Sequence, residues 1–188
     1  MAHVDDIRIR RATELDIDAI ARVHVASWQS TYRGILPPSY LDNLEIDDRV
    51  SLWRRVLIDY RDRHTVYVAE SSEAGVVGFA SAGQTIDGAL GCDREIYAIY
   101  LLAEHQGRGL GRRLVAAVAS ELASGGARSL CLWVLAANPS RGFYEHLGGR
   151  AIHAKTVEIG GLTLEEIAYG WEDMRHLIDS TSQPSGQR

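Results

Sequence analysis

The alternation of apolar and polar residues along the chain predicts a mixed α/β order. Residues 7–10 alternate apolar and charged side chains, as a half-buried strand does. Apolar residues then recur at helical spacing in two stretches, residues 17–32 and 39–60, and the second is expected to break near Leu44. Gly34 and a Pro-Pro pair separate the two stretches, because proline lacks the N–H that a helix interior needs.

After residue 60 the pattern changes to short apolar runs bounded by glycines and polar turns, which predicts strands alternating with helices. Asn138 and Pro139 are expected to open the last helix, because the missing proline N–H costs nothing in a first turn. The predicted order is β-αα-ββ-β-α-β-α-ββ. The later strands are expected at residues 65–70, 75–80, 95–102, 129–135, 151–159 and 164–171, and a helix at 109–124.

One domain accounts for nearly the whole chain. The 188 residues exceed only slightly the ~150 residues of a typical domain, and the chain holds no internal repeat. We therefore predict a single domain over residues 1–178. Residues 179–188 are rich in Ser, Gln, Pro and Gly, so they are expected to form a disordered tail.

Composition narrows the classes of function. The net charge of −5 argues against a nucleic-acid partner, because proteins that bind nucleic acids usually carry a dominant basic face. No uncharged apolar run approaches the ~18 residues of a membrane span, and the N-terminus lacks the apolar core of a signal peptide. Cys92 and Cys131 are expected to be buried thiols without zinc-binding spacing. We expect a cytoplasmic protein with no metal and no membrane partner.

The segment from Glu95 to Leu114 combines a strand, a glycine-rich turn and a helix start. Such a turn presents unpaired backbone N–H groups at the positive end of the helix dipole, which suits phosphate oxygens. Arg108, Arg112 and Arg113 add positive charge beside it. The spacing is neither the dinucleotide fingerprint nor the P-loop, and a tight structural turn with solvated arginines would also satisfy the pattern.

Two motifs stand out in the second half of the chain. They are Gln106-x-x-Gly109-x-Gly111 and, downstream, Leu132-x-Val134-x-x-x-Asn138 with Phe143-Tyr144-Glu145-x-x-Gly148. The first is similar to the acyl-CoA signature of the GNAT superfamily of N-acetyltransferases, and the second resembles that family's second motif, in the expected order. The resemblance covers about residues 7–171 and implies a GNAT fold, an α/β architecture whose mixed sheet of about seven strands splays open to form an acyl-CoA cleft.

The resemblance implies an acetyl-CoA-dependent N-acetyltransferase. The acetyl group would pass by direct attack, in a ternary complex, to a primary amine on a small molecule, peptide or protein. Acetyl-CoA is the implied co-substrate. Its expected ligands are the main chain of Ile99, Tyr100 and Leu101, the turn residues Gln106, Gly107, Arg108, Gly109, Leu110, Gly111 and Arg112, and the side chain of Asn138.

The same resemblance assigns two catalytic side chains. Glu95 lies eleven residues before Gln106, where histone-type members carry a general base, and alternation would place it on one face with Tyr97 and Ile99. Tyr144 matches the tyrosine that protonates the leaving thiolate. Asn138 and Tyr144 are one residue closer than in many members, so one of them could be rotated. Trp28 and Tyr32 are the expected acceptor contacts.

Two other functions stay open at this level. A non-catalytic acyl-CoA-binding regulatory module would keep the same cleft without turnover. A nucleotide-phosphate-binding α/β domain is a more distant alternative. The exposed C-terminal strands leave an edge that could pair in a homodimer.

Overall fold

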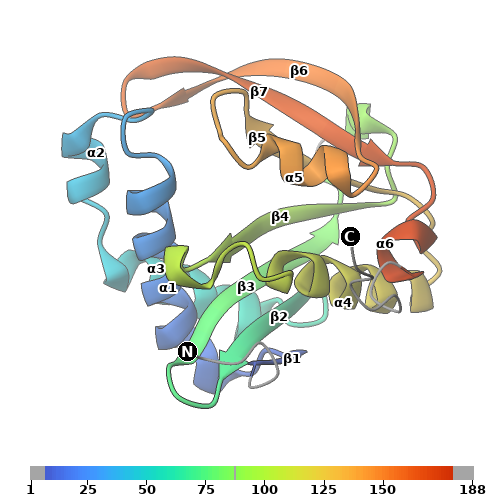
Figure 1. Cartoon of the computed structure of the whole chain (residues 1–188), viewed down its shortest axis with the longest axis horizontal. Helices are drawn as coiled ribbons and strands as arrows, with labels where there is room; N and C mark the ends of the chain where they lie inside the picture. The colour runs from blue at the N-terminus through green and yellow to red at the C-terminus, as the bar shows by residue number, and fades with distance from the viewer. Residues whose placement is uncertain (1–6, 87, 180–188) are drawn as a thin grey trace, which may run out of the picture.

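The computed structural model describes residues 7–86 and 88–179 (Figure 1). Within them, one seven-stranded sheet has the order β1-β2-β3-β4-β5-β7-β6. Neighbouring strands are antiparallel except for β4 and β5, which are parallel, so the predicted mixed sheet is confirmed. The strands are β1 (Ile7–Arg11), β2 (His64–Ser71), β3 (Gly75–Gln84), β4 (Arg94–Leu101), β5 (Leu130–Leu135), β6 (Arg150–Ile159) and β7 (Leu162–Trp171).

The helices cover both faces of the sheet. In Figure 1, α4 crosses the half of the sheet formed by β1–β4, and α5 lies beside β5. Helices α1, α2 and α3 lie together at the left of the view. The predicted break near Leu44 separates α2 from α3, and a π-helical turn, Arg55–Asp59, ends the segment. The α-helices are α1 (Ile17–Thr31), α2 (Pro38–Asp42), α3 (Ile46–Arg54), α4 (Leu110–Ser124), α5 (Arg141–His146) and α6 (Arg175–Asp179).

Apolar clusters on the two faces of the sheet hold these helices in place. Leu110, Leu114 and Val118 of α4 are almost completely buried against one face, which we call the α4 side. On the opposite face, called the α1 side, Ile20 packs with Phe79. Each fully buried aliphatic or aromatic side chain stabilises the fold by about 1.5–3 kcal/mol, so both faces anchor their helices firmly.

A β-bulge interrupts β4 at Tyr97. Opposite β3, Ser81 pairs with Ala98 and Ala82 pairs with Ile96, so Tyr97 is an extra residue. A bulge bends its strand and increases the local twist. The parallel ladder between β4 and β5 accordingly covers only residues 94–96 of β4, and beyond Ile96 the two strands separate. The splayed cleft of the predicted fold is therefore present.

The bulge also corrects the predicted orientation of the β4 side chains. Ile99 packs against the core of the α4 side, as Ile96 does, whereas Ala98 and Tyr100 pack on the α1 side. Glu95 pairs with Gly83, two residues from Ser81 on β3, and thus faces the α1 side together with Ala98 and Tyr100. The prediction that Glu95 and Ile99 share one face is wrong, because the extra residue shifts the alternation by one.

Other expectations also need correction. Pro139 lies in a turn before α5 rather than in its first helical turn, because the side chain of Asn138 accepts the Ser140 N–H at 2.8 Å and delays the helix to Arg141. Cys131 is buried as expected, whereas Cys92 is partly exposed.

The C-terminal segment begins with a helix that the pattern did not predict. The structure places Asp179 at the end of α6, and the rest of the predicted disordered tail, residues 180–188, lies outside the described residues. No helix in the described part of the chain is long and apolar enough to cross a bilayer.

Candidate active site

Two adjoining pockets meet where β4 and β5 separate. The first, the α4 lobe, has a volume of ≈ 800 Å³ and lies between the turn that precedes α4 and helix α5. The second, the α1 lobe, opens on the other side of the sheet and includes side chains of α1, β5 and β7. The cleft therefore passes through the sheet from one face to the other. The two lobes share the lining residues Ile99, Tyr100, Leu101, Ser140 and Tyr144.

The edge of β4 offers backbone groups to this cleft. Leu102 donates its N–H to the Val77 carbonyl, and the same register pairs Tyr100 with Phe79. Backbone direction alternates along an antiparallel strand, so the N–H and C=O groups of Ile99 and Leu101 point away from β3 and into the cleft. The backbone of Tyr100 points toward β3. Tyr100 therefore contributes its side chain to the site, and the predicted main-chain contact is limited to Ile99 and Leu101.

The glycine-rich turn before α4 forms a cradle of backbone N–H groups. Gly107 and Gly109 have φ angles of 70° and 76°, in the left-handed region that glycine adopts without strain. The first helical bond runs from the Arg113 N–H to the Gly109 carbonyl, and no side chain caps the helix start. The N–H groups of Leu110, Gly111 and Arg112 therefore lack helical acceptors beside the α4 lobe, as an anion-binding turn requires.

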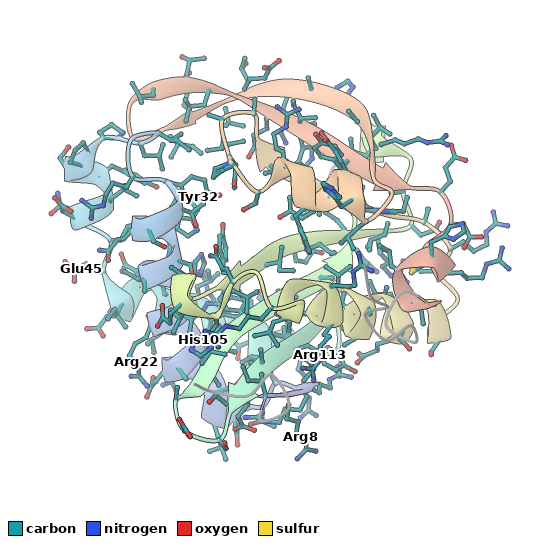
Figure 2. The ribbon with its side chains drawn as sticks, viewed as in Figure 1. Arg8, Arg22, Tyr32, Glu45, His105 and Arg113 are labelled. Atoms are coloured by element: carbon teal, nitrogen blue, oxygen red, sulfur yellow. The ribbon has the colours of Figure 1, made fainter. Side chains whose placement is uncertain are left out.

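The three arginines of the turn have different roles. Arg112 lines the α4 lobe. Arg113 turns away and donates to the Ile7 carbonyl at 2.8 Å, which ties α4 to β1 (Figure 2). Arg108 is exposed and outside both lobes. Gln106 is also exposed, and its amide donates to the Leu101 carbonyl at 3.0 Å, so it braces the turn against the end of β4.

Tyr144 lies on α5 at the junction of the two lobes. Its ring packs against Phe143 and Tyr169, with centroid distances of 5.3 and 6.1 Å. No described residue forms a hydrogen bond with its hydroxyl in the structure, so the group is available to a bound molecule. Burial raises the pKa of the Tyr144 phenol well above its usual range, with a smaller contribution from Tyr32. The phenol is thus a proton donor, rather than an anion, at neutral pH.

Glu95 lies in the wall of the α1 lobe at the last paired stretch of β4. Its side chain is buried, and one carboxylate oxygen accepts the Ile86 N–H at 2.9 Å. This bond fixes the carboxylate at the opening between β4 and β5. A carboxylate in that position can accept a proton from a group bound in the α1 lobe.

A polar cluster joins α1 to β4 and to the second motif. The Tyr32 hydroxyl lies 3.5 Å from the Tyr100 hydroxyl and accepts from the Asn138 amide at 3.5 Å. Tyr32, at the end of α1 in Figure 2, and the neighbouring Trp28 both line the α1 lobe. Asn138 and Tyr144 line this same lobe, so the shorter spacing between them does not separate them.

His24 supports the cluster from behind. Its Nδ1 accepts the Trp53 indole N–H at 3.2 Å, and its ring stacks on Tyr100 with a centroid distance of 5.4 Å. Burial, with a smaller effect of Arg49, lowers the pKa of His24 to about 3. The imidazole therefore stays neutral and positions the Tyr100 ring.

Two side chains that line the α1 lobe were not predicted as site residues from the sequence. Trp133 lies on β5, and Glu166 lies on β7 opposite Leu135. Both belong to strands that the pattern predicts, but only the pairing of β5 with β7 brings them to the cleft. Alternation along β5 places Trp133 on the face away from the core residues Leu132 and Val134. This alternation is the one feature of the sequence that could have indicated its position in the lobe.

Within residues 7–86 and 88–179, no group of three or more His, Cys, Asp and Glu side chains is arranged to bind a metal ion.

The comparisons with known proteins agree with this geometry. The family model described as FR47-like protein matches residues 80–158. The chain is 38% identical over 171 residues to the uncharacterized N-acetyltransferase YuaI of Bacillus subtilis (strain 168), covering 91% of this chain and 96% of YuaI.

Solved structures share the fold at lower identity. The PaiA N-acetyltransferase of Thermoplasma acidophilum, in complex with coenzyme A, matches with a TM-score of 0.64 and 19% identity, covering 86% of this chain and 97% of that one. The YncA protein of Salmonella typhimurium, with acetyl-CoA, matches with a TM-score of 0.63 and 22% identity, covering 97% and 99% of the two chains. The near full-length match to YuaI and the bulged, splayed strands lead to one conclusion: this chain belongs to the GNAT superfamily of N-acetyltransferases.

Proposed function

We propose that this protein transfers the acetyl group of acetyl-CoA to a primary amine by direct attack in a ternary complex. One observation carries the proposal: an anion-binding turn lies at one end of the cleft, a buried carboxylate lies at the other, and Tyr144 lines the space between them. The solved structures of the same fold that hold CoA or acetyl-CoA support the choice of co-substrate.

The α4 lobe fits the phosphates and the pantetheine arm of acetyl-CoA. Side chains at Gly107 and Gly109 would strain the left-handed backbone, so the glycines keep three N–H groups available for pyrophosphate oxygens. The outward N–H and C=O groups of Ile99 and the N–H of Leu101 can pair with the pantetheine amides as an added strand would, while the Leu101 carbonyl accepts the Gln106 amide. When bound, acetyl-CoA supplies the activated acetyl group as a thioester.

Two side chains of the chain would move the protons. Glu95 would accept a proton from the acceptor ammonium, directly or through a water, because only the neutral amine is a nucleophile. Tyr144 would donate its phenolic proton to the departing thiolate and regain one from the solvent. Its raised pKa keeps that proton in place until the thiolate develops. Trp28 and Tyr32 would contact the acceptor on the α1 side.

Two measurements test the proposal together. Acetyl-CoA at 100 times its Kd should stabilise the fold by about 2.7 kcal/mol, seen as a higher melting temperature. A thiol-release assay with a panel of primary amines should then detect turnover. Stabilisation without turnover on any amine would contradict the enzymatic function and favour a non-catalytic acyl-CoA-binding module. A melting temperature unchanged by acetyl-CoA would overturn both of these functions.

A further inference from the structure

The charged lining of the α1 lobe is entirely acidic. Of the described residues that line it, only Glu95 and Glu166 carry charged side chains, and none is Lys, Arg or His. A cation entering this lobe is therefore attracted from two strands at once, whereas a carboxylate on the same ligand is repelled by both glutamates.

The two carboxylates face one space from opposite sides of β5. Glu95 pairs with Cys131 on β5, and Glu166 pairs with Leu135. Cys131, Trp133 and Leu135 alternate onto one face, so both carboxylates and the Trp133 indole project to the α1 side. Burial raises the pKa of the Glu166 carboxyl, Lys155 opposes this, and the charge of Glu95 adds to the rise. Two carboxylates that repel each other across a pocket gain stability when a cation enters it.

A cation of the chain itself already lies at this position. The Lys155 Nζ lies 3.9 Å from the centroid of the Trp133 ring and 3.8 Å from a Glu166 carboxylate oxygen. An aromatic face beside a carboxylate is a favourable environment for an ammonium group. The lysine side chain is 37% exposed and its ion pair is at the long end of the range, so a ligand can displace it. Lys155 thus marks a cation subsite formed by Trp133 and Glu166.

We propose that the acceptor amine carries a second positive charge, which replaces Lys155 on the Trp133 face beside Glu166 while the reacting amine lies at Glu95. The inference rests on the proposed function and specifies its substrate class: diamines and related dications, rather than amino acids. Glu166 is then a specificity-determining residue, and Lys155 is a resident competitor for its subsite.

Calorimetric binding to the protein saturated with CoA tests this class without requiring turnover. The probes are α,ω-diamines of three to six carbons, each with its matched monoamine and ω-amino acid, at pH 7.5. The best diamine should bind about tenfold more tightly than its monoamine, because only the diamine exchanges the long, partly exposed Lys155 pair of Glu166 for a pair with its own second ammonium. The ω-amino acid should bind most weakly. Equal affinities for diamine and monoamine at every length would overturn the inference, as would tighter binding of the amino acid.

Three variants locate the second charge. Glu166→Gln should remove the tenfold preference and raise KM for the diamine alone, with kcat unchanged. Glu165→Gln removes the same charge from the exposed neighbour on β7 and should keep the preference. Lys155→Met should tighten diamine binding several-fold by vacating the subsite. If Glu166→Gln, with an unchanged melting temperature, keeps the preference, the subsite assignment is wrong.

The two proposals can fail separately. Binding that follows the diamine order without acetylation of any amine overturns the proposed reaction and leaves the cation subsite intact. Acetylation of monoamines and diamines with equal kcat/KM overturns the subsite and leaves the proposed reaction intact.

Discussion

Glu95 pairs with Cys131 in the parallel ladder between β4 and β5, and this ladder ends one residue later, at Ile96. The carboxylate thus lies where the sheet opens, held by the Ile86 N–H. A group at that position can reach a molecule in the cleft while its own backbone remains fixed in the sheet.

We expect Glu95→Gln to lower kcat by about 100-fold near pH 7, the usual value of a positioned general base. The loss should shrink as the pH approaches the pKa of the acceptor amine, because more of the amine is then neutral without help. A pH series of kcat checks this. Glu73→Gln, in the exposed turn between β2 and β3, is the matched control. A loss that stays constant at all pH values would contradict the role as a base.

Replacement of Tyr144 by Phe removes one oxygen from a buried ring and leaves the packing against Phe143 intact. We expect kcat to fall by about 100-fold or more, since proton donation to the leaving group is lost. Stabilisation by acetyl-CoA should change little. Steady-state kinetics and melting curves measure the two effects, and Tyr60→Phe, at a 46% exposed tyrosine remote from the cleft, is the control. Unchanged kcat in Tyr144→Phe would contradict the role of Tyr144 as the general acid.

The role of the turn before α4 can be tested against a matched glycine that follows the end of the same helix. Gly109 and Gly126 flank the same helix, both have positive φ, and a Cβ would meet no atom within 4 Å at either position. Alanine should therefore destabilise each site by a similar ~1 kcal/mol through the left-handed backbone. Only Gly109→Ala should also weaken acetyl-CoA binding, measured by calorimetry. Equal affinities of the two variants would show that the turn does not bind the co-substrate.

Adjacent arginines provide a charge-matched pair. Arg112→Ala should weaken acetyl-CoA binding by up to about fivefold, as for an exposed ion pair, and the loss should diminish with added salt. Arg113→Ala should leave that affinity unchanged but lower the free energy of unfolding by about 1–2 kcal/mol, because its bond to the Ile7 carbonyl is lost. The reverse pattern in calorimetry and urea unfolding would contradict the orientation of both side chains.

The buried His24 should make the free energy of unfolding decrease at acidic pH. Its pKa falls from 6.5 in the unfolded chain to about 3 in the folded one, so below pH 6.5 only the unfolded chain is protonated at this site. Stability that is full above pH 6.5 is therefore lost as the pH falls, by about 2 kcal/mol at pH 5. Urea unfolding at pH 7 and pH 5 measures the loss. His24→Gln should reduce it, whereas His176→Gln, at an exposed histidine, should not.

Local physics explains what the sequence pattern could predict. The turn at Gly107 and Gly109 depends on residues close together in the chain, so its position and its available N–H groups follow from the glycine spacing. The order of strands and helices follows from periodicity in the same way. Tyr144 and Asn138 came from the motif resemblance, and the structure places them in one cleft.

Long-range pairing explains what the pattern could not predict. The bulge at Tyr97 exists only relative to β3, so alternation along β4 alone assigned Ile99 to the wrong face. Arg112 and Arg113 are equivalent in composition, and only the packing of α4 beside β1 separates them. Glu166 reaches the cleft because β7 inserts between β5 and β6, an order that no local pattern encodes.

The extra residue in β4 makes the cleft depend on the length of the strand. A chain lacking Tyr97 would keep its neighbours on their present faces, because Ile96 and Ala98 already face opposite ways. It would lose the local bend, however, and β4 could continue its ladder with β5 past Ile96 and close the opening. Access to the site therefore depends on the number of residues in β4. Deletion of Tyr97 is expected to close the opening, whereas a substitution at the same position is not.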